Sequence, residues 1–464
     1  MQILRILFAR RWLIVGLLVG GILLLTPPPE GLSAQGMRAL ALLAMTMIFL
    51  ITEPIPLPAT ALLIAVGQVF LGLGDSNQIA HSYMSDAVFF IMGSLMISIA
   101  LVKQKLDKRL AFWLLRVTGP YTTRIVFGIS AACALIASFI GEHTVAAMML
   151  PVALGIIRAV EDDHKQARNL AVLLLLAISY GCAIGALGTP SGGARNAIVI
   201  EYWRQAFGIH IDYATWMAYA YPLVLLRLPF VALILLMTFR PEVTDLRRAL
   251  VRLRRVVRES GAFSLQETKA VVLFGLILFA WIAFSGQWGL GTIALTGAAL
   301  FIIFGLVRWE DLNSGVNWGV VWLYAAAISL GAQLTATGAA GWMAQQVLAL
   351  LGGTGGLAVI LAVCLLMILF TNVMSSGTAV AVLAPVTLQI AVLTGASIKE
   401  VGFVTALASA FGFLTVIGSP AAMIVYSSGY LRPLDYAKAG SKLLLLSVIM
   451  LVLLALFYWP LLGL

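Results

Sequence analysis

Long apolar stretches separated by short polar turns run along almost the whole chain. A helix needs about 20 apolar residues to cross the hydrocarbon core of a bilayer. Stretches that meet or approach this length lie near residues 12–26, 37–52, 57–73, 87–102, 170–205, 216–239, 268–286, 290–307, 319–337, 400–431 and 440–462. The pattern predicts an all-α polytopic membrane protein with about 11 transmembrane helices.

Two further apolar regions are each divided by a polar break into two short arms. Residues 125–140 and 145–157 flank Gly-Glu-His-Thr, and residues 356–370 and 379–393 flank Thr-Asn-Val-Met-Ser-Ser-Gly-Thr. Because these arms are short for a span, each pair predicts a re-entrant helical hairpin whose polar tip stops inside the membrane. Irregular backbone is tolerated at that depth only where protein or a watery cavity surrounds it.

The two polar breaks resemble one another. Pro151 follows Thr144 by seven residues, and Pro385 follows Thr378 by the same distance. This shared spacing indicates that the two hairpins belong to an internal repeat.

A second break follows each hairpin. Residues 188–190 read Gly-Thr-Pro and residues 418–420 read Gly-Ser-Pro, so the halves repeat with an offset of about 230 residues. Interrupted apolar segments at matching positions of two halves point to the binding site of a secondary transporter. The predicted boundaries are an N-terminal half (1–239) with a hairpin at about 123–158 and a broken helix at about 170–205, a basic cytoplasmic linker (240–267), and a C-terminal half (268–464) with a hairpin at about 355–395 and a broken helix at about 400–431.

Composition excludes a water-soluble protein. Of the residues, 62% are hydrophobic and 10% are charged, whereas about a quarter are charged in ordinary soluble domains. The net charge of +10 comes from arginine and lysine clusters beside the spans and does not indicate a nucleic-acid-binding surface. Under the positive-inside rule these clusters place the N-terminus in the cytoplasm and the C-terminus outside. The hairpins then enter from opposite sides, the repeats are inverted, and we expect a multi-pass protein of the cell inner membrane.

The interruptions converge if the halves pack as inverted repeats. Each interruption frees N–H groups at the start of one half-helix, which attract anions, and carbonyl groups at the end of another, which attract cations. Thr144, Ser376 and Thr378 add hydroxyl groups that can serve either ligand. The arrangement suits an anion transported with cations. Small residues that only satisfy backbone at tight helix crossings would produce the same pattern.

Three ionisable residues, Glu142, His143 and Arg195, lie beside the breaks. Charged groups at membrane depth are costly and are functional candidates by default. Arg195 could complement an anion, His143 could bind it or change protonation, and Glu142 could bind a cation or carry a proton. Alternatively, Glu142 and Arg195 form a buried structural ion pair. No metal-site spacing and no nucleophile or phosphate-binding motif is present, so we do not expect an enzyme.

Several short motifs occur together in this chain. They are Thr52–Pro58 (TEPIPLP), Phe89–Ser94 (FFIMGS), Thr144–Pro151, Gly418–Pro420, and Ser427–Tyr430 followed by Asp435–Gly440. From about Met45 to the C-terminus, the chain resembles the divalent anion/sodium symporter family, which includes transporters of di- and tricarboxylates and of sulfate. The resemblance implies the spans and hairpins described above, and a homodimer in which a mobile transport domain moves against a scaffold.

The resemblance also implies site residues. In the family each hairpin tip carries Ser-Asn-Thr, which binds substrate carboxylate, with two sodium ions beside the tips. Here the tips read Glu142-His143-Thr144 and Ser376-Gly377-Thr378, so both lack the asparagine. By position, the substrate contacts fall on His143, Thr144, Pro190, Gly377, Thr378 and Pro420, to which the reasoning from the residues adds Arg195 and Ser376. The first cation site falls on Glu142, His143 and Gly188, and the second on Asn372, Ser375, Gly377 and Gly418.

We therefore expect a secondary active transporter that moves a small anion, either di- or tricarboxylate-like or inorganic and divalent, by an elevator mechanism. Coupling to a sodium or proton gradient and anion exchange all stay open, because an acid and an imidazole occupy the first tip. The alternative function is a cation/proton antiporter in which Glu142 and His143 carry the exchanged charge. The expected partners are the anion, the lipid bilayer and a second copy of the chain, with Na+ or H+ as coupling ion and no other cofactor.

Overall fold

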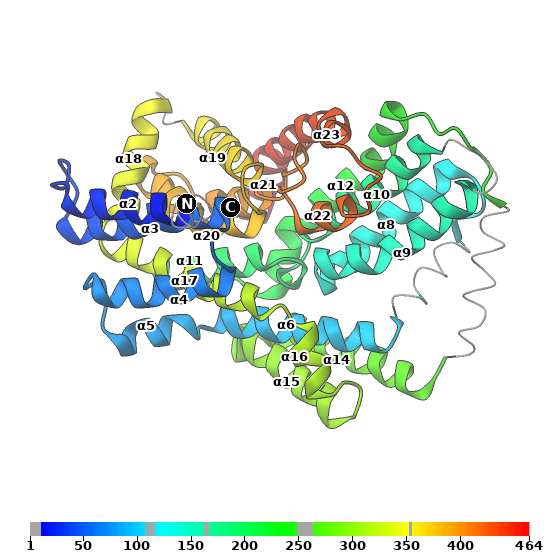
Figure 1. Cartoon of the computed structure of the whole chain (residues 1–464), viewed down its shortest axis with the longest axis horizontal. Coiled ribbons are helices and arrows are strands. Elements are labelled where there is room, and N and C mark those ends of the chain that lie inside the picture. The colour runs from blue at the N-terminus through cyan, green and yellow to red at the C-terminus, as the bar shows by residue number, and fades with distance from the viewer. Residues whose placement is uncertain are drawn as a thin grey trace, which may run out of the picture.

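The computed structural model describes residues 11–106, 109, 117–161, 167–247, 263–351 and 355–463, which fold almost entirely into helices (Figure 1). Within this part of the chain, ten helices are long and apolar enough to cross a membrane. Its β structure is a single bridge between Tyr121 and Asp245. The prediction of an all-α polytopic membrane protein is confirmed.

The helices follow one another along the two predicted halves of the chain. The helices of the first half are α2 (Arg11–Leu25), α3 (Ala34–Thr52), α4 (Leu57–Phe70), α5 (Ser76–Tyr83), α6 (Asp86–Lys103), α8 (Thr122–Ile140), α9 (Glu142–Glu161), α10 (Arg168–Gly185), the short η1 (Pro190–Gly192), α11 (Ala194–Phe207) and α12 (Tyr213–Thr238). Those of the second half are α14 (Leu265–Trp288), α15 (Leu290–Ile303), α16 (Trp309–Gly315), α17 (Trp318–Ala336), α18 (Ala339–Leu351), α19 (Gly356–Thr371), α20 (Ser376–Thr394), α21 (Ile398–Ala408), α22 (Pro420–Tyr426), α23 (Pro433–Leu453), and the terminal turns η2 (Leu454–Tyr458) and η3 (Trp459–Leu462).

The helical hairpins are α8–α9 and α19–α20, which Figure 1 shows on opposite sides of the molecule. The expectation that all their arms are too short to span is wrong, because α8, α9 and α20 contain 19, 20 and 19 residues. The polar tip residues do not interrupt the helices as predicted. They form the first turns of α9 and α20, and only Gly141 and residues 372–375 are outside the helices.

Helices from the two halves pair around the hairpins. Gly93 of α6 lies against the backbone of Ala294 in α15, and Gly319 of α17 lies against Pro58 of α4. A methyl group at Gly93 would come within 2.7 Å of the Ala294 carbonyl carbon. Small residues allow this close approach of backbones inside a membrane, where packing rather than hydrophobicity drives helix association.

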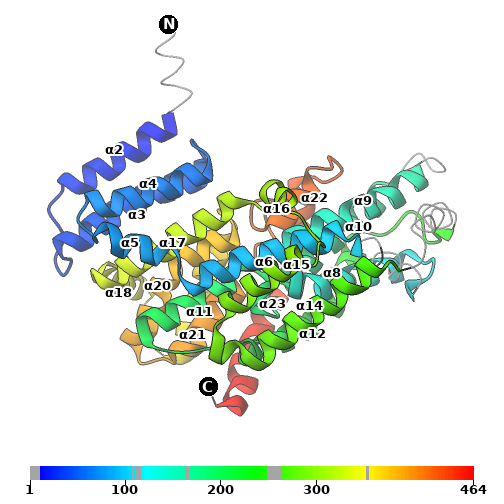
Figure 2. The same ribbon diagram turned by 90° about the horizontal axis from the view of Figure 1, so that it is seen from below.

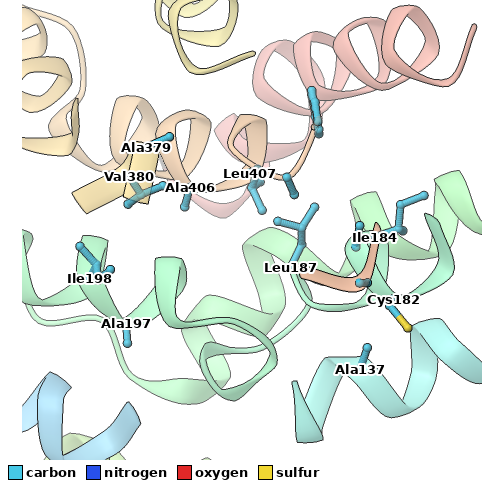
Figure 3. Packing of buried hydrophobic residues seen from close by; sticks show 14 of the residues in the cluster. Ala137, Cys182, Ile184, Leu187, Ala197, Ile198, Ala379, Val380, Ala406 and Leu407 are labelled. Atoms are coloured by element: carbon cyan, nitrogen blue, oxygen red, sulfur yellow. The ribbon is translucent and has the colours of Figure 1, made fainter. Parts of the chain in front are cut away.

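The centre of the molecule is formed by the hairpins and the broken helices. Every residue from Leu170 to Gly185 of α10 is buried, as is every residue from Ser376 to Leu388 of α20. Figure 3 shows Leu187, just after α10, on the side that faces Leu407 of α21. A helix that is apolar all round is typical of the interior of a membrane protein, and here it places both chain breaks in the protein core.

Polar contacts, most of them between residues of different helices, join segments that the sequence assigns to the same membrane side. On the side assigned to the cytoplasm, Lys103 pairs with Asp311 and Arg168 pairs with Asp435. On the other side, the indole N–H groups of Trp203, Trp342 and Trp459 donate to Ile398, Glu30 and Tyr219, respectively. The C-terminal end of the chain lies away from α2 (Figure 2). These contacts support the relative topology, whereas the absolute orientation and the two-repeat domain division stay predictions. Residues 248–262 of the predicted basic linker (240–267) lie outside the described part.

Candidate functional site

The tips of the two hairpins meet at the centre of the molecule. Gly141 ends α8 with φ of 96°, a conformation that glycine adopts without strain. The chain therefore reverses at one residue, and α9 begins at Glu142. At the second tip, Ser375 caps α20, because its hydroxyl accepts the Thr378 N–H and lies 2.8 Å from the Thr378 hydroxyl. Each tip sequence thus forms the N-terminal turn of a helix.

Arg195 connects the two tips. Its Nη1 lies 2.9 Å from Glu142 Oε1 at the first tip and donates over 2.8 Å to Ser376 Oγ at the second. The Ser419 hydroxyl, at the second break, lies 3.5 Å from Glu142 Oε2. Arg195 is 2% exposed and Glu142 is 4% exposed. A buried pair of this kind fixes its partners strongly, since the loss of either one leaves a buried charge without compensation.

A cavity of about 440 Å³ lies beside this network. One wall is formed by the hairpin tips and by residues 190–195, and the other by α6 and α17. Exposed residues at the cavity include Glu53 and Asn317, which lie in loops that the sequence assigns to the cytoplasmic side. The volume falls within the range of small-molecule sites, about 300–1,000 Å³.

Most of the predicted site residues line this cavity. They are Glu142, His143, Pro190, Arg195, Ser375, Ser376, Gly377, Thr378 and Pro420. The remaining four, Thr144, Gly188, Asn372 and Gly418, are not among its lining residues. The predicted pairing of Glu142 with Arg195 is present, so the carboxylate that could have carried a proton is held by a guanidinium. Their roles in binding stay predictions.

The sequence reasoning missed several cavity residues on α6 and α17. Ser94 lines the cavity, and its buried hydroxyl has no hydrogen-bond partner. Tyr324 also lines it and packs on the second tip, where a methyl group at Gly377 would lie 2.2 Å from its hydroxyl oxygen. Ser94 ends a motif that was recognised but given no role, whereas Tyr324 lies in a stretch that reads only as a membrane span.

Glu53 is unusual in its backbone. It ends α3 with φ of 45°, in the left-handed region that residues with a side chain rarely adopt. It is exposed and lines the cavity. The Pro-rich motif around it therefore shapes one edge of the cavity.

The fold and the site together define a polytopic membrane transporter with a central cavity between helical hairpins. The model of the sodium:sulfate symporter transmembrane region matches residues 9–464, so the chain belongs to this family. The relatives that this chain matches are named as transporters, in agreement with the expectation that the protein is not an enzyme.

The relatives align with this chain over most of their length. The sodium-dependent dicarboxylate transporter SdcS of Staphylococcus saprophyticus is 27% identical over 96% of this chain and 91% of its own. SdcS of Staphylococcus aureus (strain USA300) is 26% identical over 96% and 91%. An uncharacterized transporter of Haemophilus influenzae is 26% identical over 90% and 91%. Among solved structures, the YdaH transporter of Alcanivorax borkumensis matches 82% of this chain and 88% of its own with a TM-score of 0.52 and 14% identity, which concerns the fold alone.

Proposed function

We propose that this protein is a secondary active transporter of small anions, di- or tricarboxylate-like or inorganic and divalent, which works by an elevator mechanism. The observation that carries the proposal is the convergence of three helix N-termini on one cavity. The cavity is lined by the first residues of α9 and α20 and, at the start of α11, by residues 193–195. N-terminal ends of helices carry partial positive charge and free N–H groups, so together they favour an anion.

The side chains at the cavity support the same ligand. The hydroxyl groups of Ser94, Ser376 and Thr378 are donors of the kind that bind carboxylate or sulfate oxygens. Arg195 supplies the charge, although Glu142 neutralises part of it. Two relatives are named sodium-dependent dicarboxylate transporters, which supports a dicarboxylate as substrate and sodium as one candidate coupling ion.

The position of the cavity supports the elevator mechanism. In this proposal the mobile domain consists of α8–α12 and α19–α23, and the scaffold consists of α2–α6 and α14–α18. The cavity lies between the hairpin tips of the first group and α6 and α17 of the second. Movement of the tips along these two helices would carry the anion across the membrane without opening a continuous pore.

The alternative, a cation/proton antiporter, is less well supported. It needs Glu142 to release and bind a proton during the cycle. The guanidinium of Arg195 stabilises the ionised carboxylate at 2.9 Å, and the same group connects it to the second tip. Proton binding to Glu142 would remove the charge that pairs with Arg195 and would therefore weaken the contact that connects the two tips.

The proposal is tested with purified protein and a panel of succinate, malate, citrate and sulfate, each with and without sodium. We expect at least one anion to raise the thermal unfolding temperature and to be taken up by proteoliposomes. Sodium-driven or proton-driven cation exchange with no response to any anion would support the antiporter instead.

A further inference from the structure

Arg227 is a fully buried cation without a polar partner. It lies in α12, is 0% exposed, and none of its three side-chain nitrogens has a hydrogen-bond partner. Its guanidinium carbon lies 4.6 Å from the ring centre of Phe411 and 5.3 Å from that of Phe413. Arginine stays protonated in proteins, and cation–π contact recovers only a part of the cost of burying the charge.

The two rings place this charge beside the second break. Phe411 and Phe413 belong to the segment between α21 and α22, the interruption of the second broken helix. This segment directly follows the C-terminal end of α21, at Ala408, which carries partial negative charge. Carbonyl groups at such an end are where a transporter binds a coupling cation. The sequence already contained a signal for this residue, because Arg227 is the one arginine within the apolar stretch 216–239.

At the second break, the oxygen atoms of Asn372, a predicted cation ligand, and the nearby carbonyls of Ser409 and Phe411 already accept hydrogen bonds from the protein. Asn372 Oδ1 accepts the Leu414 N–H at 3.1 Å, and the Asn372 carbonyl accepts the Thr415 hydroxyl at 2.9 Å. The carbonyls of Ser409 and Phe411 accept from Thr371 and Asn372. These four oxygens fit a sodium ion poorly, because the ion would have to compete with a protein donor at each of them.

At the first break, a buried arginine also lies beside oxygen atoms that accept hydrogen bonds from the protein, and here the arginine is Arg195. Its Nη2 donates over 3.4 Å to the carbonyl of Ala183, near the end of α10, while its Nη1 holds Glu142. The Asn196 side-chain amide donates to the carbonyls of Ala186 and Thr189 at 2.8 and 2.7 Å. The predicted ligand Glu142 and the nearby carbonyls are thus occupied by protein donors.

We propose that Arg195 and Arg227 are resident cations that replace mobile coupling cations at the two breaks, so that the protein exchanges one anion for another without sodium. The inference rests on the proposed anion transport. A bound sodium ion leaves with the substrate, whereas a guanidinium cannot. Arg227 does not line the cavity, so a bound anion offsets the net charge of the mobile domain without contacting the guanidinium. The empty carrier would have to cross with the charge of Arg227 and no anion to offset it, which is costly inside a membrane, so return with a second anion is favoured.

The first experiment uses the wild-type protein in proteoliposomes. Uptake of a labelled anion from the panel is measured with unlabelled anion or no anion inside, and with sodium or choline on both sides. We expect uptake to require internal anion and to change less than about twofold between sodium and choline, whereas ordinary ligand coupling changes affinity about 5- to 150-fold. Steep sodium dependence, or equal uptake into empty vesicles, would overturn the inference and leave anion transport intact. No uptake of any anion would instead contradict the proposed function.

The second experiment compares Arg227→Met and Arg227→Lys with Arg124→Met. Arg124 is exposed, and its guanidinium carbon lies 5.3 Å from the ring centre of Tyr121, so its removal deletes a matched cation–π arginine outside the core. We expect sodium-free exchange to fall at least about tenfold in Arg227→Met, with part of it retained in Arg227→Lys, and to be unchanged in the control. Wild-type exchange rates in a folded Arg227→Met would overturn the role of Arg227. If this variant does not fold, the wild-type sodium comparison decides.

Discussion

The guanidinium of Arg195 lies 2.9 Å from the carboxylate of Glu142, in a buried ion pair that joins α11 to the tip of the first hairpin. The same Nη1 reaches Ser376 of the second hairpin. One side chain therefore connects both hairpins to α11. In a carrier whose hairpins move together, such a contact would keep the two hairpin tips in a fixed position relative to one another.

Removal of one member of this pair should destabilise the protein. Arg195→Met leaves Glu142 buried without a partner, and Glu142→Ala leaves Arg195 in the same state, so each should lower the free energy of unfolding by about 3–5 kcal/mol. The double variant removes both charges and should recover much of the lost free energy of unfolding. Anion transport should be abolished in the double variant as in the single ones. Thermal unfolding in detergent and anion uptake in proteoliposomes measure the two effects. Additive destabilisation in the double variant would show that the pair does not couple.

Ser376→Ala should weaken anion binding. The Ser376 hydroxyl accepts from Arg195 and lines the cavity, so its loss leaves a charged donor unsatisfied and removes a donor for the ligand. Hydrogen bonds to charged groups contribute about 1.5–3 kcal/mol, which corresponds to roughly tenfold or more in affinity. Titration calorimetry with the anion found in the screen measures the change. Ser314→Ala, on the exposed surface of α16, is the control; equal affinities in both variants would contradict this assignment.

Gly377→Ala should impair the docking of the second hairpin. Its methyl group would lie 2.2 Å from the Tyr324 hydroxyl oxygen and 2.7 Å from the ring carbon that carries it. We expect uptake to fall at least about tenfold, as a misplaced binding group commonly causes, and to recover in part when Tyr324→Ala is added. Gly275→Ala is the matched control, because nothing lies within 4 Å of its added methyl group. Full activity of Gly377→Ala alone would mean that the tip does not pack on α17 during transport.

Met423→Cys should be labelled from the cytoplasmic side. Met423 lines the cavity and is 41% exposed, while the native Cys133, Cys182 and Cys364 are buried. A membrane-impermeant maleimide should react in inside-out vesicles faster than in right-side-out vesicles. Bound anion should slow the reaction at Met423→Cys but not at Ser314→Cys, which lies outside the cavity. Labelling only from the opposite side would reverse the predicted topology.

The sequence predicted the hairpins and broken helices well because their signals are local. Gly141, the polar tips and the Gly-Thr-Pro and Gly-Ser-Pro segments interrupt apolar stretches in a way that only protein or water can satisfy at membrane depth. The boundaries were less accurate. Glu142 and Ser376 read as loop residues because they are polar, yet each begins a helix, where polar residues satisfy or accompany the free N–H groups.

The amino-acid sequence by itself determined that this chain is a helical membrane protein with interrupted apolar segments, because an exposed backbone break is costly in lipid and long apolar helices satisfy their own backbone groups. The tertiary structure alone decided which charges compensate one another. Arg195 meets Ser376 across 181 residues of chain, and Arg227 meets Phe411 and Phe413 rather than a carboxylate. The energy of a buried charge depends on the groups within a few ångströms of it, and no local pattern of residues specifies which distant helices will supply them.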